Sequence, residues 1–211
     1  MTKDEIRGLQ SDGKGRGALL LAAGSSSRMG SPKALLPWVG GTLIEYAVRQ
    51  LAAAGCSEIV VVLGVEADRV GRAVPDVPGV RVTQVVNQDL EAGRSGSVRL
   101  GAGVISGAAG VVVIQSIDQP CPAAVVEQLC RAVELGPCLV AIPVHGGRRG
   151  HPLVVSGALL SDLRAVREET LGLRGVVRAH MDKVSTVAVD DDAVLLNLND
   201  LETYERARQR P

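Results

Sequence analysis

The stretch LLLAAGSSSRMGSPKALL, residues 19–36, changes from an apolar run into a loop of glycine, serine and two cations. The leucines indicate the end of a buried strand, and Gly24 permits a turn that larger residues do not make. Arg28 and Lys33 bring positive charge into a loop whose small residues leave backbone N–H groups exposed. Because unpaired amides and cations together bind negatively charged oxygens, we predict a nucleotide triphosphate site here.

An ordinary strand-to-helix turn is the competing interpretation of this loop, and it is the commoner one for a lone glycine-rich segment. Gly24 and Gly30 are separated by five residues and Gly30 is followed by serine, so the GxxxxGK[ST] signature is not met. The GxGxxG signature is absent as well. Arg28 and Lys33 favour the phosphate site, with Pro32 stiffening the backbone just before the lysine.

The composition is that of one ordinary globular domain with enough chain for a sizeable core. The 211 residues carry 23 Lys+Arg against 23 Asp+Glu, which disfavours broad binding to nucleic acid or to an anionic membrane. With no Phe, one Trp and two Tyr, a stacking platform for single-stranded nucleic acid is also disfavoured. No apolar run reaches the roughly 18 residues of a membrane span. We therefore expect no nucleic-acid partner and no membrane partner.

The cysteines and the first residues bear on the cellular compartment. Cys56, Cys121, Cys130 and Cys138 form no CxxC pair, and they are interpreted as buried thiols of a reducing compartment. Residues 1–16 are polar and charged, without the apolar segment of a signal peptide. We expect a flexible leader over 1–16, a single domain over 17–211 and a cytoplasmic protein.

Strand-like and helix-like segments alternate along the chain. Thr42 and Glu45 form a capping box at the start of a helix that ends at Gly55. Further strands are expected at residues 59–63, 80–86, 111–117, 139–143, 153–155 and 184–189, and further helices at 66–73, 97–106, 122–135, 159–165, 173–180 and 201–208. This alternation predicts an α/β fold with a three-layer, doubly wound, mostly parallel sheet.

Polar residues follow several of these apolar segments, and in such sheets ligands bind at the carboxyl ends of the strands. Besides the glycine-rich loop, these residues are Asn87, Gly93, Ser95, Ser97, Asp118, Gln119, Asn197 and Asn199. Asp118 ends an apolar strand and is followed two residues later by Pro120, which suits a carboxylate that holds a divalent cation. The same aspartate is equally suited to cap the helix expected at 122–135, so the residues alone leave both roles open.

Residues 21–33, LAAGSSSRMGSPK, resemble the LAAGxSxRMGxPK signature of the MobA-like nucleotidyltransferases, which attach a nucleotide to molybdopterin. Within that family the chain is most similar to the molybdenum cofactor cytidylyltransferase branch, over residues 18 to 207. The resemblance implies the Rossmann-like fold of nucleotide-diphospho-sugar transferases. It also implies that the nucleotide is bound by Leu21, Ala22, Ala23, Gly24, Ser25, Arg28 and Lys33.

Two further segments resemble the metal-binding motifs of the same family. Residues 115–120, QSIDQP, are similar to its GDQP motif, with Ile117 where glycine is usual; this implies Asp118 as a magnesium ligand and Gln119 as a substrate contact. Residues 197–204, NLNDLETY, resemble its closing NxNTPED segment and imply Asn199 as the second magnesium ligand. Asp200 is the rival ligand, and a simple helix cap is the alternative for this segment.

Two more matches are carried by single polar residues. Asn87, Gly93 and Ser97 resemble the family segment that contacts the base and ribose, although an Asn after a strand is more often a turn residue. Arg149-Gly-His-Pro matches the GHP segment of the family and implies that His151 touches the substrate. A lone histidine is otherwise more often structural.

The resemblance implies transfer of CMP from CTP to the terminal phosphate of molybdenum-loaded molybdopterin, with Mg²⁺ as cofactor and release of pyrophosphate. Arg28, Lys33 and Asp118 are the implied catalytic residues. Ala22 and Ala23 resemble the AAG form associated with cytidine transfer, whereas guanylyl-transferring relatives carry GG. Three alternatives stay open: GTP as the donor, another small phosphate as the acceptor, or a non-catalytic carrier that hands the cofactor to a molybdoenzyme.

Overall fold

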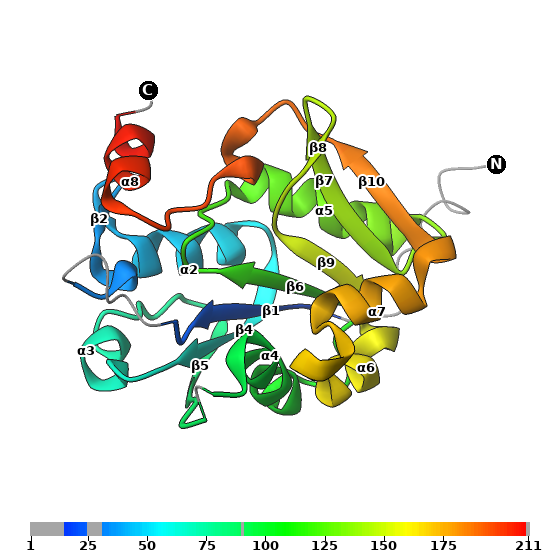
Figure 1. Ribbon diagram of the computed structural model, residues 1–211, viewed down its shortest axis with the longest axis horizontal. Helices are drawn as coiled ribbons and strands as arrows, with labels where there is room; N and C mark the ends of the chain where they lie inside the picture. Colours follow the sequence, from blue (N-terminus) through cyan, green and yellow to red (C-terminus); the bar gives the residue numbers. More distant parts are fainter. Residues whose placement is uncertain (1–14, 25–30, 90, 210–211) are drawn as a thin grey trace.

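The computed structural model describes residues 15–24, 31–89 and 91–209, which form an eight-stranded sheet with helices on both faces (Figure 1). The strand order is β10-β7-β9-β6-β1-β4-β5, and β8 pairs with β7. The strands are β1 (Arg16–Ala22), β4 (Cys56–Leu63), β5 (Arg81–Val86), β6 (Val111–Ser116), β7 (Val140–His145), β8 (Arg148–Arg149), β9 (Leu153–Ser156) and β10 (Val184–Ala188). The helices are α2 (Leu43–Ala53), α3 (Ala67–Gly71), α4 (Gly93–Val104), α5 (Ala123–Leu135), α6 (Leu160–Ala165), α7 (Leu173–Ala179) and α8 (Leu201–Arg208).

The sheet is mostly parallel, as the alternation of strands and helices predicts. β1 pairs in parallel with β4 on one side and with β6 on the other, and β9 is antiparallel to both of its neighbours. The chain runs from β1 outward through β4 and β5, then returns to place β6 on the other side of β1. The order of strands therefore reverses beside β1, which is where doubly wound sheets bind ligands.

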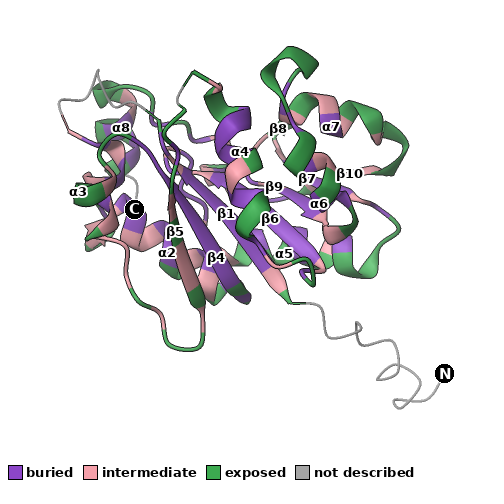
Figure 2. Ribbon diagram, turned by 90° about the horizontal axis from the view of Figure 1, so that it is seen from below, coloured by how far each residue is buried: buried purple, intermediate pink, exposed green. Residues whose placement is uncertain are grey.

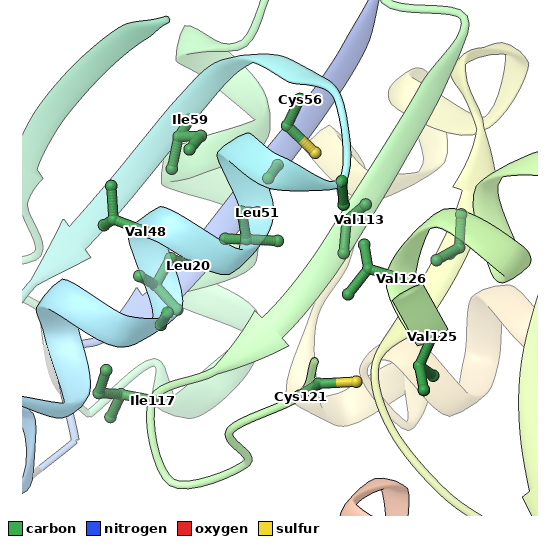
Figure 3. Close-up of a cluster of buried hydrophobic side chains, with 14 of the residues drawn as sticks. Leu20, Val48, Leu51, Cys56, Ile59, Val113, Ile117, Cys121, Val125 and Val126 are labelled. Atoms are coloured by element: carbon green, nitrogen blue, oxygen red, sulfur yellow. The ribbon is translucent and has the colours of Figure 1, made fainter. Parts of the chain in front are cut away.

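Side chains of β1 alternate between two hydrophobic layers because successive residues of a strand point to opposite faces. Leu20 packs with α2 and α5, in the cluster that Figure 3 shows around Val48, Leu51 and Val126. Leu19 packs on the other face, against α4 and α6. The central strands are buried on both faces, whereas β5 at the sheet edge is partly exposed (Figure 2). These layers confirm the three-layer α/β prediction.

The capping box predicted at the start of α2 is present. The Glu45 amide donates to the Thr42 hydroxyl at 3.4 Å, and the Thr42 amide donates to the Glu45 carboxylate at 2.8 Å. The helix stops at Ala53, and Gly55 adopts φ +83°, a conformation that favours glycine. This part of the fold is specified by residues that are close in sequence.

Helix α4 begins at Gly93, so the expectation of a helix that starts at residue 97 is wrong. The N-cap residue, Ala92, makes no side-chain hydrogen bond. Instead, the Ser95 amide donates to the carboxylate of Glu168 at 2.8 Å, across 73 residues of sequence. A cap from so far along the chain gives no local sequence signal. As a result Gly93 and Ser97 belong to the first turns of the helix rather than to the loop before it.

A short two-stranded sheet, β2 (Pro37–Trp38) and β3 (Gly41–Thr42), precedes α2 and was not expected from the sequence. Trp38 of this sheet contacts Tyr46 of α2 and Tyr204 of α8, with 6.3 Å between ring centroids in each pair. The Tyr204 hydroxyl donates to the Pro37 carbonyl at 2.6 Å. These contacts hold α8 beside the β2–β3 sheet, as Figure 1 also shows.

No helix within the described ranges combines the length and the apolar character needed to cross a membrane. Residues 1–14 of the expected leader lie outside the described residues, and β1 begins at Arg16.

Candidate nucleotide site

A cleft of about 790 Å³ opens at the carboxyl ends of β1, β4 and β6, beside the point where the strand order reverses. Most of the residues singled out from the sequence line it. They are Leu21, Ala22, Ala23, Gly24, Lys33, Gly93, Ser97, Asp118, Gln119 and Asn199. Ser25 and Arg28 lie outside the described residues. Four segments that are far apart in sequence therefore meet at one cavity, as the strand-end rule predicts.

Lys33, Asp118 and Asn199 meet at one point of the cleft. The Lys33 ammonium lies 3.5 Å from Oδ2 of Asp118 and donates to Oδ1 of Asn199 at 3.2 Å. Lys33 begins the short helix η1 (Lys33–Leu35), directly after the glycine-rich loop. The side chains of Lys33 and Asp118 are 17% and 22% exposed, so both remain accessible from the cleft.

Backbone contacts fix the position of Asp118. The Ile117 amide donates to the Leu21 carbonyl at 3.0 Å, which continues the pairing of β6 with β1. The Leu198 amide donates to the Asp118 carbonyl at 2.8 Å, which brings the segment before α8 to the end of β6. Pro122 is the N-cap residue of α5, so Asp118 does not cap that helix.

Asn199 and Asp200 have different surroundings although they are adjacent in sequence. Asn199 faces the cleft, where its carbonyl accepts from Lys33. Asp200 is the N-cap of α8, and its Oδ1 accepts from the Thr203 amide at 2.7 Å. This hydrogen bond holds the pKa of Asp200 below its usual value. The geometry thus brings Asn199 to Asp118 and assigns Asp200 to the helix terminus.

The donor set of the cleft suits a hard divalent cation that is also held by phosphates. Asp118 and Asn199 present a carboxylate and a carbonyl oxygen to the same point, where the Lys33 ammonium now lies. Oxygen ligands of this kind suit Mg²⁺, which is commonly bound by one or two carboxylates together with substrate phosphates. Among the described residues no group of three His, Cys, Asp or Glu side chains is placed to hold a metal. A cation here would complete its coordination with water or with phosphate oxygens of a nucleotide.

Asn87 is not one of the residues that line the cleft. It is buried, and its Nδ2 donates to the Ser97 hydroxyl oxygen at 3.0 Å. Its Oδ1 accepts from the Asp89 amide at 3.0 Å. Asn87 therefore positions Ser97, which does line the cleft, and both sides of its amide are already engaged.

Gln119 lines the cleft but is only 5% exposed. Its carbonyl accepts from Nε2 of Gln115 at 3.2 Å, and its own side-chain Oε1 has no hydrogen-bond partner among the described residues. A buried acceptor without a partner is costly, so this oxygen is a candidate to accept a hydrogen bond from a ligand.

His151 is half-buried and is not among the residues that line the cleft. Its amide donates to the Val194 carbonyl at 2.8 Å, which fixes the backbone before β9. Burial, and next the positive charge of Arg94, lower the pKa of His151, while Asp118 opposes this shift. The imidazole is thus close enough to the cleft to sense two of its charged residues.

Several lining residues were not predicted from the sequence, among them Gly64, Glu66, Arg69 and Arg94. Gly64 follows β4, and a Cβ there would lie 2.4 Å from the Ala23 carbonyl, so only glycine allows the two strand ends to approach so closely. Arg94 and Arg69 add two further cations to the walls. The strand-end rule points to Gly64, whereas nothing in the local sequence distinguishes the two arginines from surface residues.

Comparison with known proteins gives this cleft a family context. The model of the MobA-like NTP transferase domain matches residues 18–184. The chain is 29% identical over 197 residues to nicotine blue oxidoreductase of Paenarthrobacter nicotinovorans, covering 89% of this chain and 94% of the relative. It is 24% identical over 198 residues to molybdenum cofactor cytidylyltransferase of Escherichia coli K12, covering 91% and 95%.

A solved structure has the same fold. The manganese complex of Rv0371c from Mycobacterium tuberculosis superimposes with a TM-score of 0.73 at 21% identity, covering 93% of this chain and 99% of that one. The three-layer sheet is accordingly that of the nucleotide-diphospho-sugar transferases. With most of its length matched by the domain model, the chain belongs to the MobA-like NTP transferase family.

Proposed function

We propose that the chain is a Mg²⁺-dependent cytidylyltransferase that moves CMP from CTP to the terminal phosphate of molybdenum-loaded molybdopterin. The observation that carries the proposal is the meeting of Lys33, Asp118 and Asn199 in the cleft beside β1. A cation and two metal-type oxygen ligands at the end of a glycine-rich loop suit a triphosphate with its divalent ion. The family match and the cytidylyltransferase relative support the same reaction class.

The chemistry asked of the protein is mainly electrostatic. An oxygen of the acceptor phosphate forms a bond to the α-phosphorus of CTP, and the bond from that phosphorus to the bridging oxygen of pyrophosphate breaks. The acceptor phosphate is already an anion at neutral pH, so no general base is needed. A Mg²⁺ ion held at Asp118 and Asn199 would neutralise part of the phosphate charge.

In this scheme Lys33 stabilises the negative charge that develops on the leaving pyrophosphate, together with Arg28 of the loop. Asp118 and Asn199 are the residues that would hold the divalent ion. Gln119 and His151 are proposed to contact the acceptor, and Gly93 and Ser97 the ribose and base. Asn87 acts through its hydrogen bond to Ser97.

The preference for CTP rests on the wall of the cleft that follows β1. Ala22 and Ala23 both line the cleft, and Gly64 brings a second backbone close to Ala23. Methyl groups on this wall reduce the space for a base, which favours a pyrimidine over a purine. GTP is the alternative donor to be compared directly.

The name of one relative points to a different activity. That relative, at 29% identity, is named as an oxidoreductase, so hydride transfer from a reduced nicotinamide is a second reaction to measure. Transfer to another small phosphate and non-catalytic carriage of the molybdenum cofactor are further alternatives. The cluster of Lys33, Asp118 and Asn199 favours turnover over carriage, because a carrier has no need of a triphosphate site.

We expect the reaction to occur in the cytoplasm, with a molybdoenzyme as the eventual recipient. All four cysteines are free and buried. Burial raises the pKa of Cys56, Cys121 and Cys130 to about 12. Such thiols are unreactive, which fits a reducing compartment.

The deciding experiment measures pyrophosphate release from CTP and from GTP in parallel, with Mg²⁺ and molybdenum-loaded molybdopterin. We expect release with CTP and its loss in Asp118→Asn. Asp162→Asn is the matched control, because Asp162 lies on α6 and pairs with His180 away from the cleft. Preference for GTP would overturn only the proposed choice of CTP as the donor and would leave nucleotidyl transfer in place.

Oxidation of NADH or NADPH with a small quinone dye is followed in the same preparation. Pyrophosphate release with other phosphate monoesters, but not with molybdopterin, would move the proposal to another acceptor. No release with any acceptor, combined with dye reduction, would overturn nucleotidyl transfer in favour of redox chemistry. Retention of molybdopterin without turnover would favour the carrier.

A further inference from the structure

Arg94 is a cation in the wall of the cleft to which the chemistry above gives no role. It lies in the first turn of α4 and lines the same cavity as Asp118 and Lys33. Within the described part of the chain its guanidinium makes no hydrogen bond and no direct ion pair. Its donors therefore face the cleft without a fixed partner. An arginine with free donors in a concave site is suited to bind a carboxylate or a phosphate.

The charges around Arg94 are arranged on two sides. Desolvation by the surrounding protein lowers the pKa of Arg94, and the negative charges of Asp118 and Glu168 partly oppose this shift. Glu168 lies in the short helix η3 (Glu168–Thr170), where its carboxylate accepts from the Ser95 amide. His151 senses the charge of both Arg94 and Asp118. Arg94, Asp118, Glu168 and His151 thus form one electrostatic group.

Arg94 and Lys33 reach the cleft from different faces of the sheet. Ala34, beside Lys33, packs in the layer with α2 and α5, whereas Val98 and Ala102 of α4 pack in the layer on the other face. The sheet order also separates His151 from the loop that carries Lys33. β6, which ends at Asp118, lies between β1 and β9. Lys33 follows β1, whereas His151 precedes β9 on the other side of β6. Lys33 therefore lies on the β1 side of Asp118, and His151 lies on its β9 side. In-line transfer to phosphorus needs the leaving group and the nucleophile on opposite sides of the reacting atom.

We propose that Arg94 binds the phosphate monoester of the acceptor and holds it on the side of Asp118 that is opposite Lys33. This inference rests on the proposed nucleotidyl transfer and identifies the site that receives its second substrate. Lys33 stabilises the leaving pyrophosphate, and Arg94 binds the attacking phosphate. Burial and the charge of Arg94 lower the pKa of His151, and the carboxylate of Glu168 partly offsets the charge of Arg94.

The proposal predicts that removing the charge of Arg94 and removing the charge of Glu168 have opposite effects on phosphate binding. Arg94→Ala removes the cation and weakens binding of the phosphate, by about tenfold or more for the loss of charge-assisted hydrogen bonds. Arg94→Lys keeps the charge but loses the planar fork, so it restores binding in part. Glu168→Gln removes the competing negative charge yet keeps an acceptor for the Ser95 amide, and it strengthens phosphate binding.

The test is calorimetric titration of the full chain in two stages, with Mg²⁺ present throughout. The α,β-methylene analogue of CTP, which cannot transfer its nucleotide, first saturates the triphosphate site. Inorganic phosphate is then titrated into the loaded protein as the probe for the acceptor. Arg131→Ala serves as the control for a lost positive charge, because Arg131 is exposed on α5, remote from the cleft.

The expected result is a phosphate Kd raised about tenfold in Arg94→Ala and lowered in Glu168→Gln. The Kd of the analogue should change less than about twofold in both variants, and Arg131→Ala should match the wild type. An unchanged phosphate Kd in Arg94→Ala would overturn the assignment, as would a loss confined to the analogue. Failure of the wild type to bind the analogue at the first stage would instead refute the proposed nucleotidyl transfer, and this inference with it.

Discussion

Replacing Lys33 by methionine should have two effects of opposite sign. The ammonium lies 3.5 Å from the Asp118 carboxylate and 3.2 Å from the Asn199 carbonyl, at the point where a divalent ion would bind. Lys33→Met therefore removes a positive charge that repels the metal in the absence of nucleotide. It also removes a charge that stabilises the leaving pyrophosphate. Metal affinity should rise while turnover falls.

The magnitudes follow from the geometry. Two unit charges at about 4 Å interact by about 1 kcal/mol in water and about 4 kcal/mol at an effective dielectric of 20. Because Lys33 and Asp118 are 17% and 22% exposed, solvent screens the pair and the lower figure is the better guide. We expect the affinity for Mn²⁺ alone to rise about fivefold. Turnover should fall on the order of 10²-fold, the effect of losing one stabilising charge.

The assay is a titration with Mn²⁺, followed by the electron paramagnetic resonance of the free ion, alongside pyrophosphate release from CTP. The matched control is Lys183→Met, because Lys183 is exposed at the end of the short helix η4 (Met181–Lys183), directly before β10 and away from the cleft. The melting temperature should stay within about 4 °C of the wild type, since a partly exposed ion pair contributes little to stability. Turnover within threefold of the wild type in folded Lys33→Met would refute this reasoning, and so would weaker binding of Mn²⁺.

Two further predictions concern stability and fit. Asp200→Ala removes the cap of α8 and should lower the melting temperature by about 2–4 °C at pH 7. The hydrogen bond from the Thr203 amide lowers the pKa of Asp200 in the folded protein. The cap therefore stabilises the fold fully above the unfolded pKa of about 3.9, and this stabilisation is lost as the pH falls through the lower folded value. The wild type and Asp200→Ala should then have the same melting temperature at acidic pH. Gly64→Ala places a Cβ 2.4 Å from the Ala23 carbonyl oxygen, and we expect it to weaken CTP binding at least tenfold, as measured by calorimetry. The control is Gly103→Ala, whose added Cβ meets no neighbouring heavy atom within 4 Å, and it should leave CTP binding unchanged. Equal affinities in the two glycine variants would show that the close approach of the strand ends is unimportant for the nucleotide.

Much of the fold could be predicted because its signals are local. The capping box of Thr42 and Glu45 lies within four residues, and the buried strands are recognised by their runs of apolar residues. The start of α4 could not be predicted in this way. Its capping carboxylate comes from Glu168, and only the folded chain brings that residue to the Ser95 amide.

The same distinction holds for the candidate site. That Asp118 and Lys33 lie together follows from the rule that ligands bind where parallel strands end. The residue types alone leave Asn199 and Asp200 open, because each is a suitable metal ligand and a suitable helix cap, and only the resemblance to the family favours Asn199. The position of α8 in the fold places Asn199 at the cleft and leaves Asp200 at the helix terminus. Arg94 was missed for a related reason: its importance comes from neighbours on three other elements.

The aromatic residues provide an optical probe of the cleft in the unmodified protein. The chain has one Trp, two Tyr and no Phe, and Trp38 lies 6.3 Å from both tyrosine rings. Tyr204 belongs to α8, the helix that follows Asn199, so the indole senses whether that helix is seated. Excitation at the red edge of the spectrum selects this single fluorophore. Its emission in a stopped-flow instrument would therefore report, millisecond by millisecond, when the C-terminal wall of the cleft settles around an incoming nucleotide.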